Sequence, residues 1–130
     1  EVQEWLDRQI FRYQKWGFGL WAVILKESGE LIGQCGLTMQ PWKEQEVLEI
    51  GYLFRRLYWH KGYATEAARA CKDYAFKTLG ADEVCSIIRD TNTASQNVAL
   101  RNGMSRKDCW TKHYRGVDMP HYRYVVVQPV

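Results

Sequence analysis

The sequence predicts an α+β fold in which helices flank a mixed, mostly antiparallel sheet. Short apolar runs typical of strands alternate with segments of helical spacing, in the order helix, three strands, helix, strand, helix, two strands. The chain has 130 residues, of which 46% are hydrophobic and 25% charged, and this composition suits one globular domain over 1–130. No internal repeat or low-complexity tract divides it.

A helix and a β-hairpin are the first predicted elements. Residues 1–16 carry apolar side chains at helical spacing. Leu20–Leu25 is expected to be a buried strand, and Leu31–Met39 returns after a polar turn as the second strand. Gly33 and Gly36 in the second strand indicate a bulge or a close approach of another backbone.

The centre of the chain is expected to form strand, loop and helix. A loop over 41–45 leads to a strand at Glu46–Phe54. Residues 55–62 then form a basic, aromatic loop, which opens into an alanine-rich helix at Tyr63–Thr78. Gly80 is suited to the turn that ends this helix.

The last third predicts one more buried strand, a short helix and a final pair of strands. The buried strand is Glu83–Arg89, and the short helix covers Ala94–Asn102. The final strands are expected near Ser105–Thr111 and Tyr122–Val127, joined by a loop that contains a glycine and a proline.

Composition argues against several classes of function. The net charge of +3, from 18 basic and 15 acidic residues, is too small to indicate a nucleic-acid partner. No apolar run approaches the roughly 20 residues of a membrane span. The four cysteines lack the spacing of a zinc site, so no metal is expected, and without a secretory segment they favour a cytoplasmic location.

The passage from the third strand into its helix predicts a site for phosphate groups. The first amides of a helix have no partners within the helix, and its dipole places partial positive charge there. A loop that adds further N–H groups makes a cradle for phosphate oxygens. Gly62 and Ala64 keep this position uncrowded, while Arg55, Arg56 and Lys61 add positive charge.

The segments EIGYLF, YWHKGYATEAARACKDYAF and DTNTASQNVALRNGM resemble the central motifs of the GNAT acetyltransferase superfamily. The closest branch is that of the Rim-type enzymes, which acetylate the N-termini of ribosomal proteins. The resemblance is densest over residues 46–104, where two motifs recur in the family's order and separation. It implies a GNAT-like fold with acetyl-CoA as co-substrate. Family members usually begin with one more strand, so we expect a truncated chain or another segment that covers this sheet edge.

The resemblance also implies which residues contact coenzyme A. In the family the pyrophosphate lies on the loop-to-helix amides, and the pantetheine arm pairs with the strand before the loop. Asn92 matches a polar position that bonds this arm, although an Asx turn or a helix cap would explain the same residue. The implied cofactor-binding residues are Leu53, Phe54, Arg55, His60, Lys61, Gly62, Tyr63, Ala64, Thr65, Asn92 and Asn97.

Glu49 is the candidate catalytic base, because the family often places a glutamate that acts through water in this strand. A structural salt bridge or an exposed strand position is the alternative for Glu49. Many relatives use a tyrosine on the short helix as general acid, and Ala99 stands at that position here. Ser95 or a water molecule is therefore expected to replace it. Rival bases are His60, His113 and His121.

The sequence leaves two functions open for such a domain. One is an enzyme that transfers the acetyl group of acetyl-CoA directly to a primary amine of a protein N-terminus or a small molecule. The other is a catalytically silent acetyl-CoA-binding sensor or scaffold. The identity of the amine is not encoded in the fold. A homodimer is one assembly open to this domain, and neither nucleic acid nor membrane is an expected partner.

Overall fold

The computed structural model describes residues 3–4, 7–8 and 18–129, and it forms one six-stranded sheet in the order β1-β2-β3-β4-β6-β5. Neighbouring strands are antiparallel except β3 and β4, which are parallel, so the predicted mixed, mostly antiparallel sheet is confirmed. The helix expected over 1–16 lies largely outside the described residues. The elements are β1 (Leu20–Ile24), β2 (Leu31–Trp42), β3 (Gln45–Phe54), the short 3-10 helix η1 (Arg56–Tyr58), α2 (Tyr63–Lys77), β4 (Glu83–Arg89), α3 (Thr93–Arg101), β5 (Ser105–Tyr114) and β6 (Val117–Val127).

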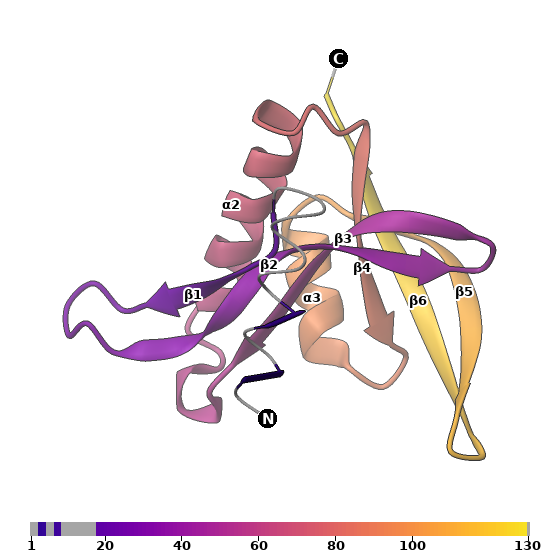
Figure 1. The fold of residues 1–130 in the computed structure, drawn as a ribbon, viewed down its shortest axis with the longest axis horizontal. Helices are drawn as coiled ribbons and strands as arrows, with labels where there is room; N and C mark the ends of the chain where they lie inside the picture. Colours follow the sequence, from indigo (N-terminus) through magenta and orange to yellow (C-terminus); the bar gives the residue numbers. More distant parts are fainter. Residues whose placement is uncertain (1–2, 5–6, 9–17, 130) are drawn as a thin grey trace.

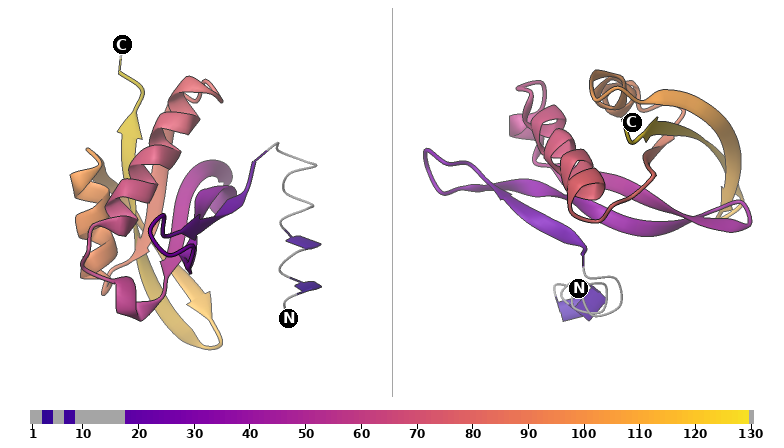
Figure 2. Two further views of the ribbon diagram at one scale, coloured as in Figure 1. Left: turned by 90° about the vertical axis from the view of Figure 1, so that its left-hand side faces the viewer. Right: turned by 90° about the horizontal axis from the view of Figure 1, so that it is seen from above.

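Both described helices, α2 and α3, lie on the same face of the sheet (Figure 2). Strands β1 to β3 run across the view of Figure 1, whereas β4, β5 and β6 run from top to bottom, so the sheet is strongly twisted. The main core fills the space between sheet and helices. Its buried members include Cys35, Leu37, Ile50, Ala75, Val84, Ile88 and Tyr124.

The opposite face of the sheet is called the Glu49 face below, because Glu49 projects from it. Side chains alternate between the faces along each strand, so Glu49 and the buried Ile50 point to opposite sides. A smaller apolar cluster of Trp42, Val47, Cys85 and Val125 lies on the Glu49 face. This face therefore carries both a buried patch and the candidate base. In the described part of the chain, no helix is both long and apolar enough to cross a membrane.

Two prolines that indicate loops in the sequence lie within strands. The loops predicted around them are therefore wrong, because they are longer than the turns in the structure. Pro41 pairs with Glu46, and Pro120 pairs with Thr111. The chain instead reverses in short turns at residues 43–44 and 115–116. The physical reason at the first turn is Trp42, which is fully buried and holds the end of β2 in the sheet.

The two glycines of β2 occur where another backbone comes very close, as the sequence predicted. A Cβ at Gly36 would lie 2.2 Å from the Gly19 carbonyl oxygen, and one at Gly33 would lie 2.5 Å from that of Leu53. Real Cβ atoms do not approach this closely, so the backbone would have to move.

Replacement of Gly36 by alanine is expected to lower the free energy of unfolding by about 1–3 kcal/mol, because strand β1 must shift to admit the methyl group. Urea unfolding followed by fluorescence measures this change. Gly51 is the matched control, since it pairs with Gly36 across the sheet and its Cβ would meet nothing closer than 4.0 Å. Equal effects at the two positions would contradict the crowding argument.

Candidate functional site

The site forms where the parallel strands β3 and β4 separate. Their ladder consists of a single pair, Glu49 with Cys85. Beyond this pair, side chains form hydrogen bonds with backbone groups that would pair with each other if the strands continued side by side. The Ile87 amide donates to Glu49 Oε2 at 2.8 Å, and Ser86 Oγ donates to the Ile50 carbonyl at 3.1 Å. The strands are therefore held apart toward their C-terminal ends without leaving these groups unsatisfied.

The separation of the strands leaves a cavity of about 240 Å³. Three residues that the sequence predicted, Glu49, Asn92 and Ser95, line this cavity together. The other predicted cofactor residues lie elsewhere: Leu53 and Phe54 end β3, Asn97 is on the exposed side of α3, and the rest lie in the loop and helix beyond β3. Further lining residues are Tyr52, Ser86, Arg89 and His121.

Glu49 combines a structural contact with the properties of a base. Burial raises the pKa of its carboxyl group to about 7, although the hydrogen bond from Ile87 and the charge of Lys112 act in the opposite direction. At neutral pH the ionised and protonated forms are therefore both well populated. Such a group can take up a proton during a reaction and release it afterwards.

The hydroxyl group of Tyr52 is buried and has no hydrogen-bond partner among the described residues. Burial is the main cause of the raised pKa of Tyr52, and the nearby Ser95 side chain lowers it by a smaller amount. The phenol is thus neutral near pH 7 and can donate a hydrogen bond. An unpaired buried hydroxyl beside a cavity is an observation that points to a polar ligand group.

Replacement of Tyr52 by phenylalanine is expected to raise the free energy of unfolding of the ligand-free protein by about 1 kcal/mol, because it removes a buried, unsatisfied hydroxyl. Chemical denaturation with and without coenzyme A measures the effect. The gain in stability should shrink when the ligand is present, since the wild-type hydroxyl then has a partner. Destabilisation of the ligand-free protein would show that Tyr52 is already satisfied.

Asn92 acts as the cap of α3, which is the alternative that the sequence left open. Its side-chain oxygen accepts a hydrogen bond from the Ser95 amide at 3.1 Å. This contact fixes Asn92 and Ser95 at the edge of the cavity. Ala99, at the position of the family's tyrosine, is buried in the core.

The loop before α2 presents an open helix start. His60 and Gly62 adopt positive φ angles of 62° and 84°. No described side chain caps the helix, and the first bond within it runs from the Glu66 amide to the Gly62 carbonyl at 3.0 Å. A Cβ at Gly62 would meet nothing within 4 Å. The preceding amides can therefore be approached from solvent, as an anion cradle requires.

Part of the positive charge expected at this cradle is used within the protein. Arg55 forms an ion pair with Glu30 at 3.2 Å. Arg56 lies over the ring of Trp59, 5.7 Å from its centroid. His60 and Lys61 are exposed. The cradle thus depends on main-chain amides more than the sequence suggests.

The strand register shows which main-chain groups of β3 face the gap. The Arg55 amide donates to the Ile32 carbonyl of β2, and in an antiparallel pair such bonds alternate along the strand. Backbone groups of Arg55 and Leu53 therefore point to β2, whereas those of Tyr52 and Phe54 point to the β4 side. The Phe54 carbonyl already accepts the Trp59 indole N–H at 2.9 Å. The Tyr52 backbone and the Phe54 amide remain directed at the gap.

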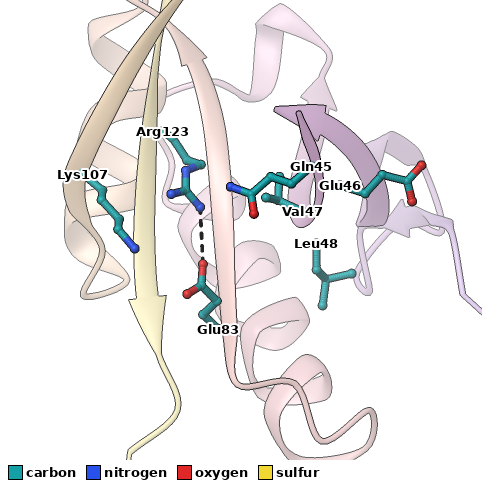
Figure 3. A pocket seen from close by; sticks show the side chains of 7 residues that line it. All are labelled: Gln45, Glu46, Val47, Leu48, Glu83, Lys107 and Arg123. Atoms are coloured by element: carbon teal, nitrogen blue, oxygen red, sulfur yellow. Dashed lines mark hydrogen bonds and ion pairs between the residues drawn. The ribbon is translucent and has the colours of Figure 1, made fainter. Parts of the chain in front are cut away.

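A second cavity, of about 270 Å³, lies near the opposite ends of β3 and β4 (Figure 3). Arg123 is buried there and donates to Asp108 at 3.0 Å and to Glu83 at 3.3 Å. None of the predicted site residues lines it. Arg123 is the deeply buried charged residue among those that line this cavity, and both of its partners are carboxylates. We therefore interpret the cavity as a structural polar cluster.

Sequence reasoning missed Tyr52 and Arg89 as site residues. Tyr52 follows Gly51 in EIGYLF and resembles a core aromatic of a strand. Arg89 resembles an ordinary polar end of a buried strand. Their shared position beside the cavity depends on where β3 and β4 part, which no local pattern encodes. Among the described residues, no group of three His, Cys, Asp or Glu side chains could hold a metal ion.

The twisted mixed sheet, which opens between two parallel strands next to an uncapped helix start, matches the fold of solved GNAT-family structures. The chain belongs to the GNAT acetyltransferase family, since the model of the acetyltransferase (GNAT) domain matches residues 1–105. A relative in Bacillus subtilis (strain 168), the uncharacterised protein YkkB, is 40% identical over 80% of this chain. Another, the FsC-acetyl coenzyme A-N(2)-transacetylase of Aspergillus fumigatus, is 29% identical over 86% of this chain. The chain spans 60% and 51% of the lengths of these two proteins.

Solved structures show the same fold. The acetyltransferase from Agrobacterium tumefaciens str. C58 is 31% identical, with a TM-score of 0.74 over 92% of this chain and 67% of its own. A ribosomal-protein alanine acetyltransferase from Vibrio fischeri reaches a TM-score of 0.79 over 96% of this chain and 71% of its own. Its identity is 18%, so this likeness concerns the fold alone.

Proposed function

We propose that this domain transfers the acetyl group of acetyl-CoA to a primary amine, with Glu49 as the base that acts through water. The observation that carries the proposal is the position of Glu49 at the last pair before β3 and β4 separate. A carboxyl group with a pKa of about 7 stands at this point, in the wall of the cavity. A structural ion pair alone would hold the pKa low instead.

The described residues fit two parts of coenzyme A, the pyrophosphate and the amide-rich arm that ends in the thiol. The open start of α2 and the free space at Gly62 suit the pyrophosphate. The unpaired Tyr52 hydroxyl and the main-chain groups of Tyr52 suit the amide-rich arm, which would extend the sheet edge as an added strand does. Acetyl-CoA supplies an acetyl thioester, whose thiol has an ordinary pKa of about 8.5 and leaves without a strong acid.

The chain's own task is to remove a proton from the acceptor and to stabilise developing charge. An ammonium group has no lone pair, so the acceptor must lose one proton before attack, and its nitrogen loses a second proton as the departing thiolate becomes the free thiol. Glu49 takes up the first of these protons through water and returns it to solvent. The Phe54 amide, which faces the gap, is the proposed main-chain donor to the thioester oxygen, whereas the Leu53 amide faces β2.

Ser95 is proposed as a polar contact near the reacting atoms. It lines the cavity, and its side chain lies close enough to Tyr52 to lower that phenol's pKa. Because Ala99 offers no hydroxyl and Ser86 Oγ already donates to the Ile50 carbonyl, Ser95 and Tyr52 provide the hydroxyl groups for this contact. Both are neutral near pH 7 and can donate a hydrogen bond to the departing sulfur.

The test of the proposed function measures binding and turnover separately. Calorimetric titration of acetyl-CoA into the purified chain should show binding at one site, and amines should then accelerate release of the free thiol. Binding without amine-dependent thiol release would indicate the silent sensor instead. Failure of coenzyme A to bind the folded chain would exclude both the acetyltransferase and the silent sensor.

A further inference from the structure

The sheet register places a row of polar side chains across the Glu49 face at the cavity. Cys85, the partner of Glu49, and Arg89 are four residues apart on β4, so both side chains project from the Glu49 face. Arg89 pairs with His121 of β6, and His121 pairs with Trp110 of β5. Glu49, Arg89 and His121 all line the cavity. Three strands thus bring a carboxyl group, a guanidinium group and an imidazole to one place.

Arg89 has unused hydrogen-bonding capacity. Its Nε is buried and has no hydrogen-bond partner among the described residues. Asp90 lies 3.7 Å from this nitrogen, which is beyond a hydrogen bond. The side chain is 39% exposed, so the outer nitrogens of its fork can still be reached from solvent. A planar fork with free donors is suited to a carboxylate.

Lys112 adds a second cation to the same face. It projects from β5 two residues beyond Trp110, and its ammonium group lies 5.8 Å from the centroid of that ring. The strand register places it beside the cavity, since Trp110 pairs with the cavity-lining His121, and its charge favours the ionised form of Glu49. No described carboxylate lies within salt-bridge distance of Lys112, since the neighbouring Asp108 and Asp118 pair with Arg123 and His113.

His121 is held in one orientation between these cations. Its Nδ1 lies 2.8 Å from the Met119 carbonyl oxygen, which can only accept, so Nδ1 carries a proton. The other charges near the cavity are therefore Glu49 on β3, Arg89 on β4 with its ion-pair partner Asp90, and Lys112 on β5. Formal charges balance, but Arg89 keeps solvent-accessible donors and Lys112 has no ion pair among the described residues, so both can still contact an anion.

We infer that the acceptor is a small amine that also carries a carboxylate, with Arg89 and Lys112 holding the carboxylate while Glu49 receives the proton of the amine. This inference rests on the proposed function and names its substrate class. The acceptor would take the side of the cavity lined by Glu49, Arg89 and His121, while the coenzyme A arm contacts Tyr52 and Ser95, so only a small amine fits within about 240 Å³. Two cations beside the site repel a polyamine, which offers them no anion.

Matched acceptors test the inference through turnover. The twenty α-amino acids, their carboxamides, dipeptide amides and spermidine are compared as acceptors by acetyl-CoA-dependent thiol release. At least one amino acid should exceed its own amide by about tenfold or more in kcat/KM, which is the effect of one charge-assisted contact. Equal or better use of amides or spermidine would overturn the inference, and preference for dipeptide amides would favour peptide N-termini.

Two variants show whether the two cations cause this preference. Arg89→Gln and Lys112→Gln should each bring the acid-to-amide ratio of kcat/KM toward one. A general folding defect would lower both rates equally and leave the ratio unchanged. Lys77→Gln is the matched control, because Lys77 is an exposed cation on the last turn of α2, away from the Glu49 face. An unchanged ratio in both cavity variants would overturn the inference.

A binding measurement separates this inference from the proposed function. The preferred amino acid, its amide and spermidine are titrated into the ¹⁵N-labelled chain without cofactor, and the indole N–H signal of Trp110 is followed. The amino acid should shift this signal at lower concentration than either comparison, and Arg89→Gln should remove the difference. This result does not require turnover. A silent domain can therefore confirm the inference, and tighter binding of spermidine would contradict it.

Discussion

Replacement of Glu49 by glutamine is expected to lower kcat/KM for acetyl transfer by about 10²–10⁴-fold, the usual contribution of a positioned general base. Glutamine has nearly the same shape, and its carbonyl oxygen can still accept the hydrogen bond from the Ile87 amide. The strands should therefore remain separated, and acetyl-CoA affinity should not change. Steady-state kinetics with calorimetry of acetyl-CoA binding distinguishes loss of the base from loss of the site.

The pH dependence of the rate provides an independent test of Glu49 as the base. In the wild type, kcat/KM should rise as the carboxyl group with a pKa of about 7 becomes ionised. Glu49→Gln should lose this limb of the profile. Glu46→Gln is the matched control, since Glu46 lies exposed on the same strand but on the opposite face. A variant at position 49 that kept both rate and profile would exclude Glu49 as the base.

The same substitution should change stability with a definite sign. The fold raises the pKa of Glu49 from 4.5 to about 7, so the folded state binds more protons than the unfolded state between these values. Wild-type stability therefore falls as the pH rises through this range, by up to about 3 kcal/mol. Glutamine does not titrate. The variant should gain stability relative to the wild type between pH 5 and 8, as measured by urea unfolding.

Replacement of Gly62 by glutamate is expected to weaken coenzyme A binding by about 100- to 1000-fold. A new negative charge about 4 Å from a phosphate costs roughly 4 kcal/mol at a protein surface before salt screening reduces it. The introduced side chain also enters the free space before α2 and offers its own carboxylate to the open amides. Calorimetric titration of coenzyme A into the variant measures the loss.

Gly80→Glu is the control that separates location from backbone strain. Gly80 follows α2 at its other end, has a φ of 67°, and its Cβ would also meet nothing within 4 Å. Both variants force a side chain into the left-handed region, at a cost of roughly 1–2 kcal/mol in stability. Only the variant at position 62 should lose coenzyme A affinity. Similar losses in both would place the phosphate site away from the start of α2.

Much of the fold could be predicted because apolar periodicity and turn residues are local signals. The largely apolar run at 46–54 predicted β3, and the alanine-rich spacing after Gly62 predicted α2. The close backbone approaches at Gly33 and Gly36 followed from glycines inside a strand. The helix start could be predicted as an anion cradle because backbone amides behave alike in every helix.

By itself, then, the sequence determined the order of elements, the open start of α2 and the choice of Glu49. Tertiary structure decided where β3 and β4 part, and thus that Tyr52 and Arg89 share a cavity with Glu49. It also placed Pro41 within the sheet, because Trp42 is buried against distant residues. Periodicity fixes which side of a strand a residue faces, whereas only the pairing of strands fixes which side chains become neighbours.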